Sequence, residues 1–322
     1  MNRLRVILCA ILAAAVLPAA ALAQDTDLQE QKVERRLYDK SVVFATVDTT
    51  VLGMDIYLPK PGKVNGRCVI YSYGGGFIEN NQRATSTQSF CRRLADDGYF
   101  VAAIDYRLGL KGVKMNGVLS MVKPLMNAVR MAAEDLFRAV NCILDNAPRW
   151  GIDPESIILC GSSAGAITSL QADYELANRT SMTAGIPEDF RFAGVISFAG
   201  AVFSTEGQCD YTVHSPSPTF FLHGTADNLV TYNKIQFFSK GFFGSNQLAA
   251  RFEKFGFPYK IMRFEGEGHS VASRMNENYD DVIWFIDNMA IGKRNLRIDE
   301  TFNDVERELQ KWDRISAGKL YK

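Results

Sequence analysis

A serine flanked by glycines follows a short apolar run near the middle of the chain. Gly161-Ser162-Ser163-Ala164-Gly165 comes directly after an expected strand at 156–160, and residues 166–172 can open a helix. This is the G-x-S-x-G pattern in the strand, tight turn, helix context of a nucleophile elbow. The glycines avoid collisions with the neighbouring strand and helix, and the helix N-terminus offers backbone N–H groups to a developing oxyanion. Ser163 is therefore predicted to be a nucleophile.

A serine hydroxyl needs a base, and three histidines follow residue 23. His269 stands in a glycine-rich loop, Gly266 to Ser270, just after an apolar strand, where sites of open α/β sheets are built. Asp227 follows another apolar strand and can orient a histidine and stabilise its charged form. The chain order Ser163, Asp227, His269 is the order that this architecture requires. His269 is thus the predicted base and Asp227 the predicted acid.

The other two histidines have less demanding interpretations. His223 stands at the end of a strand rather than out on a loop, which favours turn structure over catalysis. His214 lies among Ser215, Pro216, Ser217 and Pro218 and is expected to be a loop residue, with a contact to substrate as the alternative.

A second source of oxyanion donors is expected after another strand. Tyr73-Gly74-Gly75-Gly76-Phe77 follows the strand at 67–72, and three consecutive glycines let backbone N–H groups approach a ligand closely. The alternative is a glycine turn without a binding role.

Composition and charge exclude several classes of protein. The 322 residues are 47% hydrophobic and 22% charged, which predicts a folded core. Lys plus Arg and Asp plus Glu both number 36, a balance that argues against a nucleic-acid binder. Residues after position 23 include five widely spaced cysteines without CxxC or CxxxxH pairs, so no metal site is predicted. We expect buried thiols and at most one disulfide.

The first 23 residues predict an export signal. Arg3 and Arg5 precede an apolar run from Val6 to Leu17, and Ala21-Leu22-Ala23 provides an A-x-A cleavage site. The alternative, a membrane anchor, is disfavoured because the run is shorter than the ~20 residues of a span. Removing residues 1–23 takes away two basic residues and no acidic one, which leaves a net charge near minus two. The protein is expected to be periplasmic or secreted, without stable membrane insertion.

The remaining pattern predicts an α/β fold with a mostly parallel, eight-stranded sheet and helices on both faces. Strands are expected at 41–48, 54–58, 67–72, 99–104, 156–160, 192–198, 218–222 and 259–264. Apolar residues at helical spacing predict one helix over 129–144, ending before Pro148, and another over 282–289, closed near Gly292.

The domain prediction is a signal peptide at 1–23, one domain at 24–292 and a peripheral C-terminal tail at 293–322. The tail is expected to be helical near 300–313 and to have no function. Two apolar segments, 109–125 and 237–257, could cover the site or belong to the core.

Five ordered motifs resemble α/β-hydrolase carboxylesterases, in the branch with a glycine-rich oxyanion motif that includes hormone-sensitive-lipase-like and other small esterases. They are Tyr73 to Phe77, Asp105 to Leu108, Gly151 to Pro154 with Gly161 to Gly165, His223 to Asp227, and Gly268 to Ser270. The resemblance spans about residues 52–290. It implies an oxyanion hole of the backbone N–H groups of Gly75, Gly76 and Ala164, beside a Ser163, His269 and Asp227 triad. Tyr73 replaces a histidine frequent in this branch, and Ser162 replaces an acid.

The expected reaction is two-step acyl transfer through an acyl-enzyme, with no cofactor and no metal. The expected substrate is a short-chain or aryl ester, as a small molecule or as an acetyl or feruloyl group on a polysaccharide. A serine peptidase or lipase on the same fold is one alternative. A non-catalytic binding protein that kept the fold is another. No oligomeric state is predicted.

Overall fold

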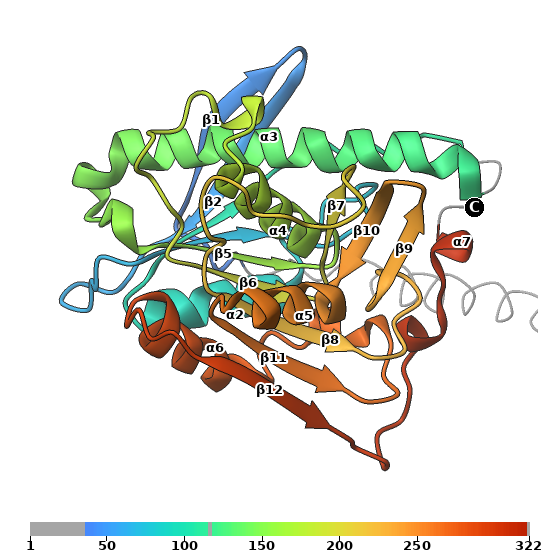
Figure 1. The fold of residues 1–322 in the computed structure, drawn as a ribbon. Helices are drawn as coiled ribbons and strands as arrows, with labels where there is room; N and C mark the ends of the chain where they lie inside the picture. Colours follow the sequence, from blue (N-terminus) through green and yellow to red (C-terminus); the bar gives the residue numbers. More distant parts are fainter. Residues whose placement is uncertain (1–35, 115–117, 321–322) are drawn as a thin grey trace, which may run out of the picture. The chain divides into compact units, whose positions relative to one another are not determined.

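The computed structural model describes residues 36–114 and 118–320 (Figure 1). The predicted signal peptide at 1–23 lies outside the described residues.

A nine-stranded sheet carries the fold (Figure 1). Its spatial order is β1 (Lys40–Val47), β2 (Thr50–Tyr57), β4 (Phe100–Ile104), β3 (Cys68–Ser72), β5 (Ile157–Ser162), β6 (Gly194–Phe198), β8 (Thr219–Gly224), β11 (Tyr259–Phe264) and β12 (Arg297–Phe302). The strands from β4 to β12 are parallel, whereas β1 and β2 pair antiparallel with each other and with β4. All eight predicted strands are present, and β12 is an addition to them.

The register of the central strands brings their carboxyl ends to one edge. Ser72 of β3 pairs with Gly161 of β5, Ser162 pairs with Phe198 of β6, and Gly224 of β8 pairs with Phe264 of β11. These strands are buried on both faces, which explains their nearly continuous apolar sequences. The loops after β3, β5, β8 and β11 therefore leave the sheet at the same edge.

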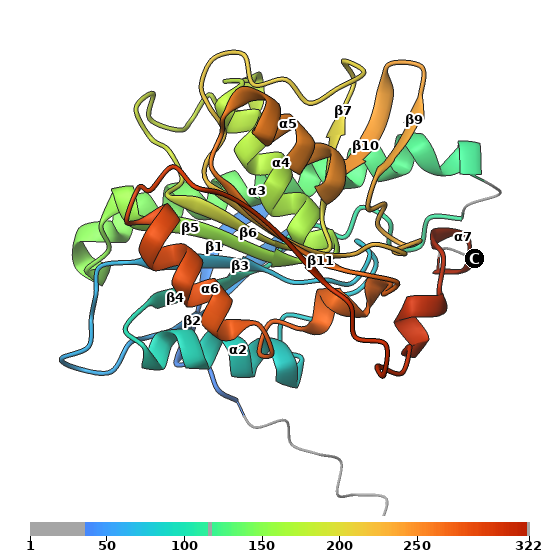
Figure 2. The ribbon, with the colours of Figure 1, turned by 60° about the horizontal axis from the view of Figure 1, so that its bottom comes forward.

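Helices cover both faces of the sheet, as predicted (Figure 2). One face carries α2 (Thr85–Asp96) and α6 (Tyr279–Phe285), the latter continued by a π-helical turn, η4 (Ile286–Ala290). The other face carries α3 (Val118–Trp150), α4 (Ala164–Ala177) and α5 (Ser245–Phe255). Each face has its own apolar core: Phe90 and Phe285 lie in one, and Leu136 and Phe252 in the other.

The long helix α3 extends beyond Pro148, whereas the sequence predicted that it would end before this residue. It contains Pro148 and continues to Trp150. A proline removes one backbone hydrogen bond, but so near the terminus little helix depends on that bond. The Trp150 ring stacks on Phe100 of β4, with centroids 5.0 Å apart. This packing holds the last turn against the sheet, so the prediction of an end before Pro148 is wrong.

A second sheet of three antiparallel strands was not predicted. It consists of β7 (Ala201–Ser204), β10 (Lys240–Gly244) and β9 (Lys234–Phe237), in that order. The hairpin of β9 and β10 projects Phe237 and Phe238, whose residues are 62% and 87% exposed. Further along the same segment, Phe243 and Phe252 are buried in the core. The segment 237–257 thus contributes to both the surface and the core.

The C-terminal segment differs from its prediction. Residues 297–302 form strand β12 in parallel register with β11 rather than the start of a helix, and ion pairs such as Arg263 to Asp299 (Nε to Oδ1, 2.6 Å) join the two strands. Up to residue 320, where the description ends, two short elements follow: η5 (Lys311–Arg314) and α7 (Ala317–Leu320). Backbone pairing with β11 overrides the weak helical pattern, so residues 297–302 of this predicted tail are part of the sheet.

No disulfide joins the five cysteines of the described residues, Cys68, Cys91, Cys142, Cys160 and Cys209. The single disulfide that the sequence allowed is therefore not formed among them. Across residues 36–114 and 118–320, no helix is long and apolar enough to cross a bilayer, and no cluster of three or more acidic, histidine or cysteine side chains is arranged to hold a metal ion.

Helix α4 is anchored by a buried carboxyl group whose protonation should affect stability. Asp173 accepts hydrogen bonds from the hydroxyl and the backbone N–H of Ser217, at 2.5 and 3.1 Å. Burial raises the pKa of Asp173 to about 6, whereas the unfolded chain titrates near 3.9. Between about pH 4 and 6 the folded state alone keeps this proton, so the free energy of unfolding falls as pH rises, by about 3 kcal/mol in all.

We expect Asp173→Asn to remove this dependence. Its free energy of unfolding relative to the parent protein, from urea titrations, should rise by about 2 kcal/mol between pH 4 and pH 7. Exposed Asp145→Asn on α3 is the matched control and should show no such rise. If the free energies of unfolding of Asp173→Asn and of the parent protein differ by the same amount at every pH, the pKa of Asp173 is not raised by folding.

Candidate active site

Ser163 occupies a sharp turn between β5 and α4. Its backbone has φ 52° and ψ −119°, a conformation that costs a non-glycine residue energy and is held only by its surroundings. The Ser163 N–H donates to the carbonyl oxygen of Phe198 on β6 at 2.8 Å. A Cβ atom at Gly165 would lie 2.0 Å from the Ser72 carbonyl oxygen, so only glycine lets α4 start this close to β3. The turn therefore holds the Ser163 side chain out at the edge of the sheet.

The three side chains predicted from the sequence form one hydrogen-bonded chain. Ser163 Oγ lies 2.7 Å from His269 Nε2, and His269 Nδ1 lies 2.7 Å from Asp227 Oδ2. An ionised carboxylate only accepts, so Nδ1 carries the proton of a neutral His269 ring and Nε2 presents its lone pair to the serine hydroxyl. This is the hydrogen-bonding order that a serine nucleophile and its base require.

Asp227 is kept ionised by its neighbours. Its side chain is fully buried, and burial alone would raise its pKa. Hydrogen bonds from His223 and His269 outweigh burial and hold the pKa of Asp227 well below its usual range. The second oxygen, Oδ1, accepts from the backbone N–H groups of Leu229 and Val230 at 2.8 and 3.0 Å. The carboxylate is therefore negative at neutral pH and fixed in orientation.

His223 has a more specific place than the predicted turn. It is the fifth residue of β8 and fully buried. Its Nε2 lies 3.3 Å from Asp227 Oδ2 and 3.2 Å from the carbonyl oxygen of Val230, and its Nδ1 lies 2.8 Å from Ser245 Oγ. Because both neighbours of Nε2 are acceptors, that nitrogen carries the proton. Asp227 thus lies between two histidines, a role for His223 that reasoning from its strand-end position missed.

Ser162, one of the two departures from the resembled pattern, connects two parts of the site. Its buried hydroxyl donates to the carbonyl oxygen of Ala272 at 2.6 Å. Ala272 belongs to the 3₁₀ turn η3 (His269–Ser273), which His269 opens. The hydrogen bond therefore joins the serine turn to the histidine turn.

The glycine run after β3 forms a tight turn beside Ser163. The Gly75 carbonyl oxygen accepts from the N–H groups of Ile78 and Glu79 at 3.0 and 3.1 Å. Gly76 and Ala164 line the same cavity as Ser163, whereas Gly75 builds the turn. Two of the three residues predicted for the oxyanion hole are thus placed beside the serine, and their role as donors stays a prediction.

Tyr73, the other departure from the family pattern, belongs to the core. Its ring is buried and stacks on Tyr106 with centroids 4.5 Å apart. The Tyr106 hydroxyl donates to the Tyr73 carbonyl oxygen at 2.7 Å. These contacts fix the start of the glycine run against the loop after β4.

His214 is not brought to the site. Its N–H donates to the carbonyl oxygen of Ala177, the last residue of α4. Ser163 precedes the first residue of this 14-residue helix, so the two positions are roughly 20 Å apart at 1.5 Å per residue. The alternative of a substrate contact at His214 is therefore disfavoured.

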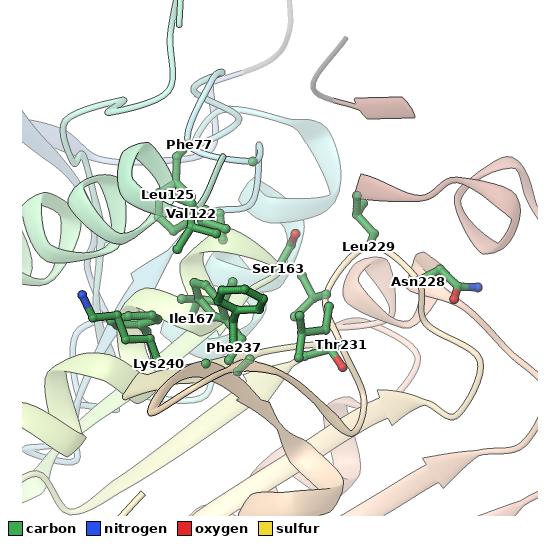
Figure 3. Close-up of a pocket in the computed structure, with 18 of the residues that line it drawn as sticks. Phe77, Val122, Leu125, Ser163, Ile167, Asn228, Leu229, Thr231, Phe237 and Lys240 are labelled. Carbon is green, nitrogen blue, oxygen red and sulfur yellow. The ribbon is translucent and has the colours of Figure 1, made fainter. Parts of the chain in front are cut away.

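A cavity of about 640 Å³ opens beside Ser163 (Figure 3). Its wall is mostly apolar and comes from distant parts of the sequence: the start of α3, helix α4, the β9–β10 hairpin and the C-terminal segment. The apolar side chains on it include Phe77, Val122, Leu125, Ile167, Phe203, Val230, Ile235, Phe237, Phe238 and Phe242. Both segments that the sequence offered as covers thus contribute to the wall.

Comparison with known proteins assigns the family. The BD-FAE family model matches residues 54–214, half of the chain. The chain therefore belongs to the BD-FAE family, an α/β-hydrolase-like esterase family. The matched range includes the glycine run and Ser163 but ends before Asp227 and His269. The resemblance and the α/β-hydrolase fold inferred from the motifs are confirmed.

Two curated relatives are named as esterases. The chain is similar to gut esterase 1 of Caenorhabditis elegans, at 30% identity over 39% of this chain and 22% of the relative. It is also similar to fumonisin B1 esterase of Sphingopyxis macrogoltabida, at 29% identity over 36% of this chain and 21% of the relative. The chain spans about a fifth of the length of each of these relatives.

Solved structures share the fold. The apo form of esterase 2 from Thermogutta terrifontis superposes with a TM-score of 0.57 at 21% identity, over 80% of this chain and 95% of that one. The propionate-bound form gives a TM-score of 0.56 over 77% and 94%.

Proposed function

We propose that this protein is a serine esterase that hydrolyses carboxylic esters through an acyl-enzyme. The observation that carries the proposal is the chain of two 2.7 Å contacts from Ser163 through His269 to Asp227, with Ser163 on the wall of an apolar cavity. Membership of an esterase family and the esterase relatives support it.

In the first step, Ser163 Oγ attacks the ester carbonyl carbon while His269 Nε2 takes the hydroxyl proton. The buried, ionised Asp227 stabilises the imidazolium that forms. The negative charge that develops on the carbonyl oxygen is stabilised by the N–H groups of Gly76 and Ala164, beside the serine. Collapse of this intermediate breaks the bond to the alcohol oxygen, which takes the proton from His269 and leaves. The acyl group stays on Ser163.

In the second step, water enters the same arrangement. His269 takes a proton from the water as it attacks the acyl carbon, and the resulting intermediate returns Ser163 to its hydroxyl form with the same proton. The carboxylic acid is released, and neither step calls for a metal or an organic cofactor.

The cavity supports an acyl group larger than acetyl. Its volume of about 640 Å³ lies within the range of ~300–1,000 Å³ that is typical of pockets for drug-sized ligands. Phenylalanine side chains on the wall suit an aryl group, because aromatic rings pack edge-to-face or offset. Aryl esters, including a feruloyl group on a polysaccharide, therefore fit this proposal better than acetyl esters.

We also propose that the protein is exported. The support is the composition of residues 1–23, with Arg3 and Arg5 before an apolar run and an A-x-A site before Gln24. Expression of the full chain in a bacterial host should yield a periplasmic or secreted form whose N-terminal sequencing starts at Gln24. Retention of the intact N-terminus in the membrane fraction would favour an anchor instead.

The reaction is tested with p-nitrophenyl esters from acetate to decanoate. We expect Ser163→Ala to lower turnover by at least about 10⁴-fold, because the nucleophile is lost, while the unfolding midpoint changes little. Exposed Ser181→Ala is the matched control and should retain the parent rate.

Undiminished turnover by purified Ser163→Ala would exclude this mechanism. Cleavage of a fluorogenic dipeptide panel but not of esters would favour a peptidase, and a preference for the longest acyl chains a lipase. Binding of esters without turnover by the parent protein would favour a non-catalytic role.

The cavity makes a separate prediction about specificity. We expect Phe238→Ala to lower kcat/KM for p-nitrophenyl or methyl ferulate about tenfold or more through lost aryl contact, with less than about twofold effect on p-nitrophenyl acetate. Phe255→Ala, a half-exposed phenylalanine that does not line the cavity, is the control. Equal losses on both esters would show that Phe238 does not contact the acyl group.

A further inference from the structure

The chain returns to the active site after its last strand. Beyond β12, residues 303–316 run along the edge of the sheet where the predicted catalytic side chains lie, and form the short turn η5 (Figures 1 and 2). Contacts join η5 to η3, the turn that starts with His269.

Asp313 of η5 binds the backbone on both sides of His269. Its Oδ1 accepts from the N–H of Gly268 at 3.0 Å and from the N–H of Ser270 at 3.1 Å. Its Oδ2 accepts from the N–H of Gln310 at 2.7 Å, which closes the turn on itself. One carboxylate oxygen therefore fixes the peptide groups that determine the direction of the histidine side chain.

The backbones approach closely at this point. A Cβ atom on Gly268 would lie 2.5 Å from the Cα atom of Asp313, so no larger residue fits before His269 unless η5 moves. Burial would raise the pKa of Asp313, but hydrogen bonds from Ser270, Gln310 and Gly268 hold it below the usual range. The acceptor thus stays charged, and hydrogen bonds to charged acceptors are the stronger kind.

A second contact secures the same segment. Glu267, which precedes Gly268, is buried, and it pairs with Arg307 of the C-terminal segment at 3.3 Å (Nε to Oε2) and with Arg274. The C-terminal segment therefore binds the histidine loop at residues 267, 268 and 270.

We propose that Asp313 is a positioning residue for the esterase reaction: it holds His269 so that Nε2 stays within hydrogen-bond distance of Ser163. The inference rests on the proposed function. Catalytic groups must be held close to their productive geometry, and a displacement of about 1 Å can cost on the order of 10²-fold in rate. Asp313 does not touch substrate, so its loss should lower kcat and leave KM little changed.

The test compares four variants by kcat and KM on a p-nitrophenyl ester. We expect Asp313→Ala to lower kcat about 10- to 100-fold with KM within about twofold. Asp313→Asn keeps an oxygen acceptor and should recover most of the loss. Gly268→Ala keeps the carboxylate but pushes η5 away, and should resemble Asp313→Ala. Glu308→Ala, an exposed acid of the same segment, is the control and should match the parent protein.

Folded fraction, measured by circular dichroism at the assay temperature, separates positioning from folding. If kcat of Asp313→Ala falls by no more than the folded fraction of the variant falls, the proposal is overturned. A kcat equal to that of the parent protein overturns it as well. An Asp313→Asn variant as slow as Asp313→Ala overturns the assignment to these hydrogen bonds. Ser163→Ala is assayed in parallel in each case. If this variant is inactive, the proposed esterase function is retained even when the Asp313 proposal fails. If it is fully active, the proposed function itself is wrong.

Discussion

The buried negative charge of Asp227 is the constraint on which the geometry of this site depends. A buried carboxylate is tolerated only when its oxygens are paired, and here His269, His223 and two backbone N–H groups pair with it. Each partner comes from β8, from the loop after it or from the loop after β11. Because β8 and β11 are adjacent and parallel, their loops meet at one edge, and the charge can be satisfied only when both loops close around it.

Much of the sheet and the three predicted catalytic side chains could be derived from the sequence, because short buried strands leave continuous apolar runs and because Ser163, Asp227 and His269 each follow such a run. Strand β12 left no such pattern. Its sequence RIDETF is charged and mostly exposed, as edge strands often are, and its pairing with β11 makes it a strand. His223 was missed for a related reason: its importance comes from Asp227, four residues later, whose carboxylate turns back to contact the histidine ring.

The phenylalanine-rich segment shows where residue type carries too little information. Phe238 is 87% exposed beside the cavity, while Phe252, fourteen positions later, is 1% exposed in the core. Both lie in stretches of similar composition, so an apolar pattern could not separate a wall from a core. The difference arises because β9 pairs with β10, and β10 with β7, in a sheet separate from the main one, whereas α5 packs against β8 and β11.

The C-terminal segment contributes to two functions of the site at once. Asp313 binds the loop that holds His269, and three residues later Ser316 lies on the wall of the cavity, as does Leu320. On the proposed function, an acyl group in contact with this wall would act on the segment that contains Asp313. Large and small acyl groups would then differ in binding energy and also in how firmly His269 is held, since binding energy remote from the reacting bond can stabilise the productive arrangement. On the proposed function, preference for acyl size and catalytic rate would therefore be coupled through residues 313–320.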